Sequence, residues 1–240
     1  PDGSLATTHK SQGSDMGLFG GFLGWEAHDE RLPESEKYIA TAGINIAINI
    51  VDIGNGHPNL YKITLYNNNE TRKLTAISTG GGMIEVIAID DVKVSMAGDF
   101  FETLIYCKDP ENIIAFLKAS ISYDNIEFHK GEISFIEIKS QAFLDEAIYK
   151  ELLAMEAVLF IKQLQPVLPV MARKDLKVPF ISCNEMMEYN AGKNKALWQL
   201  AVDYEMARGN ISAPEVFEKM RAIIHIMGNA IELGLKGTHY

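Results

Sequence analysis

The chain has 240 residues, of which 47% are hydrophobic and 22% are charged, and its formal net charge at pH 7 is −10. These are the proportions of an ordinary globular protein, long enough for one large domain or two small ones. Nucleic-acid binders need an excess of Lys and Arg to neutralise phosphates. The negative charge therefore argues against nucleic acid, and also against an anionic membrane surface, as a partner.

The sequence shows no sign of a membrane span or of secretion, and its few cysteines are typical of a protein from a reducing compartment. No apolar run approaches the roughly 20 residues that span a bilayer, and no basic segment followed by an apolar one marks a secretory signal. Two cysteines, Cys107 and Cys183, are too few for a disulfide framework or to hold an iron–sulfur cluster alone. We expect a cytoplasmic protein. Because the chain begins at Pro1 without a start Met, we also expect it to be part of a longer polypeptide.

Residues 1–97 predict a mixed α+β region. Residues 15–43 are helical in character, and Gly43 lies at their end, where a glycine commonly terminates a helix. Residues 44–53 alternate isoleucine with Asn or Ala, which is typical of a half-buried strand. We expect helices followed by an antiparallel meander, whose further strands are residues 60–66, 72–78, 83–90 and 92–96.

Residues 98–164 predict the ferredoxin-like βαββαβ order. Asp109 and Pro110 are typical of a helix start. The helix after them carries Ile113, Phe116 and Leu117 on one stripe. The predicted strands are residues 100–108, 125–129, 132–139 and 157–164, and the predicted helices are residues 111–123 and 143–155.

The rest of the chain predicts a linker and an all-α segment. Residues 165–180 are interrupted by prolines and are typical of a linker. In residues 181–240, capping boxes begin at Ser182 and Ser212. The last helix, at about residues 213–233, is apolar on much of its surface, and we expect a partner to cover it.

Three consecutive glycines, Gly80, Gly81 and Gly82, lie between two predicted strands. One interpretation is a hairpin turn in which glycine supplies positive φ angles. The other is a nest of backbone N–H groups from Ser78 to Gly82 that binds a carboxylate or a phosphate. The residues alone leave both interpretations open.

Two polar segments are further candidates. Lys10 precedes a predicted helix, where its charge and the helix dipole favour an anion, although capping by Ser14 or Asp15 explains the same pattern. His57 is held extended by Pro58, and it is either a general base or an ordinary loop histidine. The sequence has no serine-hydrolase, CxxC, HExxH or phosphate-loop motif.

Several stretches, in collinear order, resemble the iron–sulfur-dependent bacterial L-serine dehydratases, also called L-serine ammonia-lyases. THKSQGSDMGLFGGFLGW and DERLPES resemble the family's TxKGHGTD…GGLLGF…DERI, although Gln12-Gly13-Ser14 replaces His-Gly-Thr. HPN and ISTGGGMIEV resemble its HPNT and SIGGGxIE. Residues 100–164 resemble the ACT domain of some members, and residues 181–237 resemble the helices that open the catalytic domain.

The resemblance implies a domain order. Residues 1–97 form a serine dehydratase beta-type domain of the allosteric-substrate-binding kind. Residues 98–164 form an ACT-like domain, residues 165–180 a linker, and residues 181–240 the first helices of the catalytic alpha-type domain. The implied fold class is α+β with a terminal all-α segment.

The resemblance also implies a reaction: a [4Fe-4S] cluster, without pyridoxal phosphate, removes water from L-serine to give pyruvate and ammonia, in serine catabolism and gluconeogenesis. An iron site acts as a Lewis acid on the substrate hydroxyl. The family's cluster cysteines lie beyond the opening helices, so we assign no catalytic or metal residue here. We expect a regulatory and structural role together with a catalytic domain or alpha-type subunit.

An alternative is a non-catalytic ACT-type module that senses an amino acid and acts through a partner chain. In either case we expect a homodimer, because sheet edges and apolar helices are left uncovered. L-serine is the expected substrate or effector. The residues expected to bind it are Lys10, His57, Asn59, Ser78, Gly80, Gly81 and Gly82.

Overall fold

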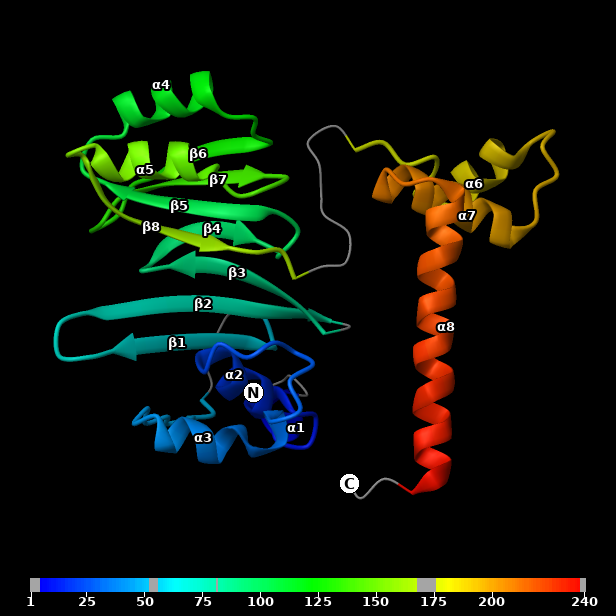
Figure 1. Cartoon of the computed structure of the whole chain (residues 1–240), viewed down its shortest axis with the longest axis horizontal. Helices are drawn as coiled ribbons and strands as arrows, with labels where there is room; N and C mark the ends of the chain where they lie inside the picture. Colours follow the sequence, from blue (N-terminus) through cyan, green and yellow to red (C-terminus); the bar gives the residue numbers. More distant parts are fainter. Residues whose placement is uncertain (1–4, 52–55, 81, 168–175, 238–240) are drawn as a thin grey trace. The chain divides into compact units, whose positions relative to one another are not determined.

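The computed structural model describes residues 5–51, 56–80, 82–167 and 176–237. The chain separates into two units, Pro1–Ala97 and Gly98–Tyr240. Helices and two four-stranded antiparallel sheets make up the described residues, so the predicted α+β class is confirmed (Figure 1). No helix in the described parts of the chain combines the length and apolar character needed to cross a bilayer.

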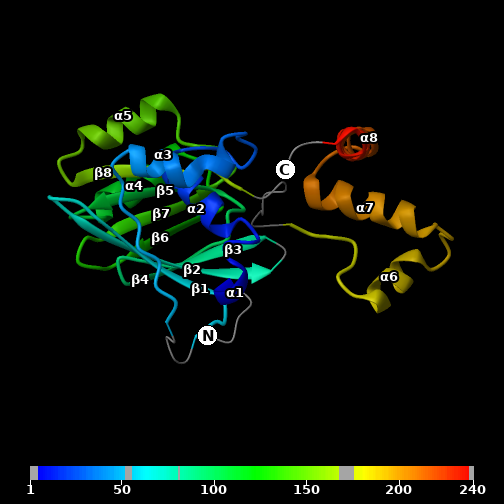
Figure 2. The same cartoon turned by 90° about the horizontal axis from the view of Figure 1, so that it is seen from below.

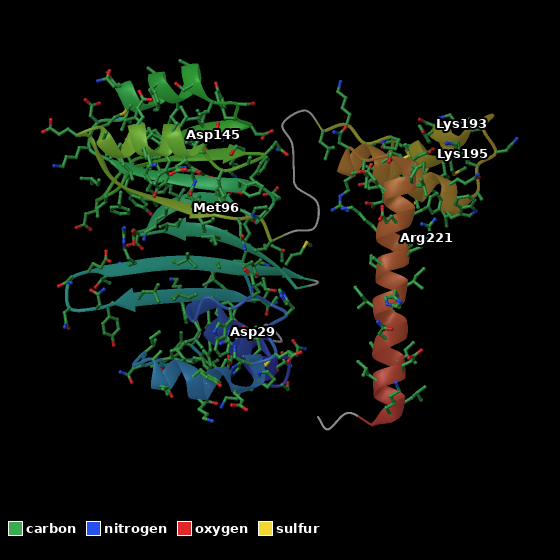
Figure 3. All side chains as sticks on the ribbon, in the orientation of Figure 1. Asp29, Met96, Asp145, Lys193, Lys195 and Arg221 are labelled. Atoms are coloured by element: carbon green, nitrogen blue, oxygen red, sulfur yellow. The ribbon has the colours of Figure 1, made fainter. Side chains whose placement is uncertain are left out.

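The first unit begins with short helices: α1 (Leu5–Thr8), α2 (Ser14–Phe22), the 3-10 turn η1 (Leu32–Glu34) and α3 (Ser35–Thr41). A Cβ atom at Gly20 would lie 2.3 Å from Cδ2 of Leu32, so glycine allows α2 and η1 to approach. Between them, Asp29, labelled in Figure 3, accepts hydrogen bonds from the backbone and guanidinium of Arg31. These hydrogen bonds within the DERLPES segment stabilise the conformation of the connection between α2 and α3.

The predicted strand at residues 44–53 is wrong for its described part. Residues 44–51 join no ladder of the described sheets, and residues 52 and 53 lie outside the described residues. Ile44, Ile48 and Ile50 are 40%, 45% and 53% exposed. Alternating hydrophobicity marks a strand only where a neighbouring strand supplies backbone partners and a face to cover. Within the described residues this segment has neither.

The first sheet is a meander with the strand order β1-β2-β3-β4. A turn at residues 67–70 connects β1 and β2, and the Asn67 side chain accepts the backbone N–H groups of Asn69 and Glu70 at 2.8 and 2.9 Å. This is the local bonding that makes Asn favourable in turns. The strands are β1 (Leu60–Tyr66), β2 (Thr71–Gly80), β3 (Met83–Ile89) and β4 (Val92–Met96).

The second unit opens with a βαββαβ arrangement in the sheet order β6-β7-β5-β8. This is the ferredoxin-like plan. Both helices supply side chains to one core against one face of the sheet, including Ile113, Leu117 and Leu152, all 0% exposed. The elements are β5 (Phe101–Cys107), α4 (Glu111–Ser120), β6 (Asn125–His129), β7 (Phe135–Ser140), α5 (Glu146–Ala154) and β8 (Val158–Leu164).

Three helices end the chain: α6 (Cys183–Asn190), α7 (Leu197–Gly209) and α8 (Ala213–Lys236), the last viewed end-on in Figure 2. Ser182 accepts the backbone N–H of Glu185, and the Glu215 carboxylate accepts hydrogen bonds from the backbone N–H and the hydroxyl of Ser212. Lys195, labelled in Figure 3, forms an ion pair with Asp203 that connects the α6–α7 loop to α7. In α8, apart from buried Val216, the apolar side chains are exposed: Phe217, Met220, Ile223, Ile224, Ile226, Met227, Ile231, Leu233 and Leu235.

Substituting two adjacent leucines of α5 tests which side of this helix faces the core of the second unit. Leu152 is 0% exposed and Leu153 is 48% exposed. We expect Leu152→Ala to destabilise the second sheet by about 2–5 kcal/mol, because it removes buried methyl groups and leaves a cavity. Leu153→Ala should change the stability of the second sheet by less than about 1 kcal/mol. Native-state hydrogen exchange of the β5 and β7 amides measures both, and equal losses of protection would contradict this core.

Candidate functional site

The HPN segment lies beside the end of strand β2. Leu60 pairs with Ile77 in the β1–β2 ladder, and the carbonyl of Asn59 accepts the backbone N–H of Ser78 at 2.9 Å. Residues that are about 20 positions apart in sequence are therefore neighbours. The structure brings together His57, Asn59 and the segment that leads into the glycine turn.

His57 is exposed and its ring is held by the backbone. Its Nδ1 accepts the N–H of Asn59 at 3.2 Å. The proton of a neutral His57 ring therefore belongs on Nε2, which is the nitrogen that remains to meet a ligand. This geometry suits hydrogen bonding to a ligand at the end of β1.

The glycine turn requires unusual backbone angles. Gly80 and Gly82 have φ angles of +102° and +80°, a region that other residues rarely adopt. A Cβ atom at either position would have no described atom within 4 Å. Glycine is therefore needed here for its dihedral angles, and the space beside the turn is open. Gly81 lies outside the described residues, and the N–H of Ser78 is already bonded to Asn59.

The start of α2 lies near the start of β1. Burial raises the pKa of Tyr61, a hydrogen bond with Ser14 opposes that rise, and the charge of Asp15 adds to it. Tyr61 is two residues after Asn59, so residues 14–15 approach the HPN end of β1. Sequence reasoning missed Tyr61, because nothing in a strand pattern tells which helix end a tyrosine meets.

The THKSQGSD segment is held by an internal hydrogen bond between His9 and Asp15. Nδ1 of His9 lies 2.7 and 2.8 Å from the carboxylate oxygens of Asp15. The N-cap of α2 is Gly13, with φ of +75° and no side-chain capping bond, so Asp15 pairs with His9 in place of the capping role considered above. Lys10 is exposed beside this pair. We name residues 8–15, 57–59 and the described part of 78–82 the loop cluster.

Comparison with known proteins decides the family. No protein-family model matches the chain. It is 30% identical over 158 residues to the "Probable L-serine dehydratase, beta chain" of Bacillus subtilis (strain 168), covering 62% of this chain and 72% of that protein. The chain belongs to the L-serine dehydratase beta-chain family. It is also 30% identical over 122 residues to the "L-serine dehydratase, beta chain" of Peptoniphilus asaccharolyticus, covering 50% of this chain and 55% of that relative.

The cysteines of this L-serine dehydratase family member do not fit an iron–sulfur cluster. Cys107 is 2% exposed and packs in the core between helices and sheet, where burial raises the pKa of its thiol. Cys183 is exposed at the start of α6. A four-iron cluster is held by cysteine thiolates that surround one point. This chain supplies only two thiols, one of them enclosed by aliphatic side chains.

A second polar group lies in the second unit, on the face of the sheet opposite the helices. Glu102 on β5 and Glu137 on β7 are each 2% exposed. Nζ of Lys139 lies 3.8 Å from Oε1 of Glu102 and 3.4 Å from Oε1 of Glu137. Burial raises the pKa of Glu102 to about 8, Lys139 opposes the rise, and the charges of Glu137 and Asp99 add to it. Glu102 is therefore largely protonated at neutral pH.

The raised pKa of Glu102 makes stability depend on pH. Between its ordinary pKa near 4.5 and about 8, the folded chain holds a proton that the unfolded chain has lost. The contribution of protonated Glu102 to the free energy of unfolding is therefore present at low pH and is lost as pH rises through that window. Glu102→Gln copies the protonated form. We expect it to melt like the parent at about pH 5 and several degrees higher at about pH 9.

Thermal unfolding followed by circular dichroism across that pH range measures the effect. The matched control is Glu156→Gln, an exposed substitution before β8 that should keep the parent's pH dependence. Parallel melting curves for Glu102→Gln and the parent at every pH would show that the Glu102 carboxyl has no raised pKa.

Proposed function

We propose that this chain is the regulatory and structural part of an L-serine dehydratase, which converts L-serine to pyruvate and ammonia. The observation that carries the proposal is the 30% identity over 158 residues to a protein named as a probable L-serine dehydratase beta chain. The stretches that resemble the family support it further. Two of them, HPN and ISTGGGMIEV, meet in the first unit where Ser78 bonds to Asn59.

The name "beta chain" supports a division of labour between chains or domains. We propose that a catalytic alpha-type chain or domain supplies the [4Fe-4S] cluster, because the two cysteines here do not fit one. The exposed apolar side of α8 supports contact with that partner. Ile223, Ile224 and Met227 are 51–60% exposed, which is costly in water unless another surface covers them.

We propose that L-serine binds as an effector in the loop cluster. The space beside Gly80 and Gly82 is open, and a turn of glycines lets a carboxylate approach backbone N–H groups without side chains in the way. Nε2 of His57 is placed to donate a hydrogen bond at the same end of β1. Lys10 contributes a positive charge to the cluster's THKSQGSD segment.

Calorimetric titration of the chain with L-serine tests this effector site. We expect saturable binding of L-serine, weakened at least about tenfold by His57→Ala, since a tenfold change corresponds to about 1.4 kcal/mol, the size of one good hydrogen bond. His28→Ala removes an exposed histidine outside the cluster and should bind like the parent. Absence of L-serine binding, or equal binding by His57→Ala, would reject the loop cluster as the site.

Substitutions in α8 test whether the alpha-type partner binds the apolar side of this helix. Ile224→Asp places a charge in the apolar side, and Ala222→Asp places the same charge two residues away, on the other side of a helix with 3.6 residues per turn. We expect Ile224→Asp alone to abolish co-purification with an L-serine dehydratase alpha chain. If both variants co-purified like the parent, α8 would not be the contact.

A further inference from the structure

Three potential metal ligands converge on the β6–β7 hairpin of the second unit. Glu127 and His129 are two positions apart on β6, so they project from the same face. Glu127 pairs directly with Glu137 across the ladder. One ligand atom from each of the three side chains lies within 4.8 Å of the others.

The charges of this group are incompletely balanced by the protein. Like charges directly across a ladder destabilise a sheet, yet Glu127 and Glu137 occupy paired positions. Nζ of Lys139 lies 3.4 Å from Oε1 of Glu137 and 3.8 Å from Oε1 of Glu102, so this one cation faces both carboxyl groups. A divalent cation between Glu127 and Glu137 removes the repulsion, because two carboxylates and one neutral imidazole neutralise a charge of +2.

One buried oxygen atom of the ligand group lacks a hydrogen bond. Glu137 is 2% exposed, and its Oε1 has no hydrogen-bond partner among the described atoms, with Nζ of Lys139 lying 3.4 Å from it as an ion-pair partner. Buried polar atoms without a partner are costly and are rare in proteins unless a water or an ion completes them.

His129 is already positioned as a ligand. Its Nε2 lies 2.6 Å from Oε2 of Glu137, and its ring stacks on Phe135 with 4.9 Å between the ring centres. The packing fixes the ring, so Nε2 can exchange its hydrogen bond for a metal without a large rearrangement. Glu127 is exposed and gives the site an opening to solvent.

We propose that Glu127, His129 and Glu137 bind a divalent transition-metal ion. Imidazole nitrogen combined with carboxylate oxygen favours ions such as Zn²⁺ over Mg²⁺ or Ca²⁺, which prefer oxygen alone. Three protein ligands leave at least one position for water. The ion ties edge strand β6 to β7, and it therefore stabilises the second unit independently of L-serine binding and of any iron–sulfur cluster.

Titration of the whole chain, first dialysed against a chelator, with Zn²⁺ tests this site. We expect one ion per chain and a higher melting temperature when Zn²⁺ is bound. Glu127→Gln should weaken Zn²⁺ binding at least about tenfold, and since Glu127 is exposed, circular dichroism should show an unchanged fold. His129→Gln should weaken it likewise. The matched control Glu132→Gln, an exposed change in the same hairpin, should bind Zn²⁺ like the parent.

Substitution with Co²⁺ identifies the ligands. The visible spectrum should show bound cobalt without the near-ultraviolet thiolate band that coordination by the exposed Cys183 would give. Absence of Zn²⁺ binding, equal binding by Glu127→Gln and the parent, or a thiolate band that Glu127→Gln does not change would each overturn the proposal. The three residues would then be the His129–Glu137 hydrogen bond with an exposed carboxylate beside it.

Discussion

Ser78 donates its backbone N–H to the carbonyl of Asn59, and this bond extends the β1–β2 ladder past Leu60. The ladder fixes which residues meet at that end of the first sheet. Because the register pairs Leu60 with Ile77, the HPN segment reaches the entrance of the glycine turn. A shift of one residue would turn the side chains of β1 to the other face. The proposed effector site therefore depends on backbone pairing more than on any single side chain.

The second unit depends on a different balance. Aliphatic residues fill the face of its sheet that carries α4 and α5, whereas the opposite face buries Glu102 and Glu137. Carboxylates in such surroundings stay neutral, pair with cations or bind metal ions. This sheet combines these responses: Glu102 holds a proton, Lys139 lies between the two carboxylates, and Glu137 is part of the proposed metal site. The electrostatics of this face thus follow from burial.

Much of this architecture could be predicted from the sequence, because local patterns determine it. Alternation located β1, and the Asp109-Pro110 start and apolar stripe located α4. Residues 44–51 show the limit, since their alternation is as regular as that of a strand but the described sheets offer them no ladder. Within the candidate site, the family resemblance named His57, Asn59 and Ser78 as expected binding residues, but that Asn59 and Ser78 are neighbours came from the β1–β2 register. The His9–Asp15 pair and the contact of Tyr61 required coordinates, because they depend on how a helix end meets a strand.

We propose that this chain regulates an L-serine dehydratase whose cluster is held by another chain or domain. The most direct test of this role is pyruvate formation from L-serine by an alpha chain or catalytic domain purified without oxygen, measured with and without this chain. We expect the chain alone to make no pyruvate and its addition to change the L-serine dependence of the partner's rate. An alpha chain with the same rate at every L-serine concentration, whether or not this chain is present, would contradict it.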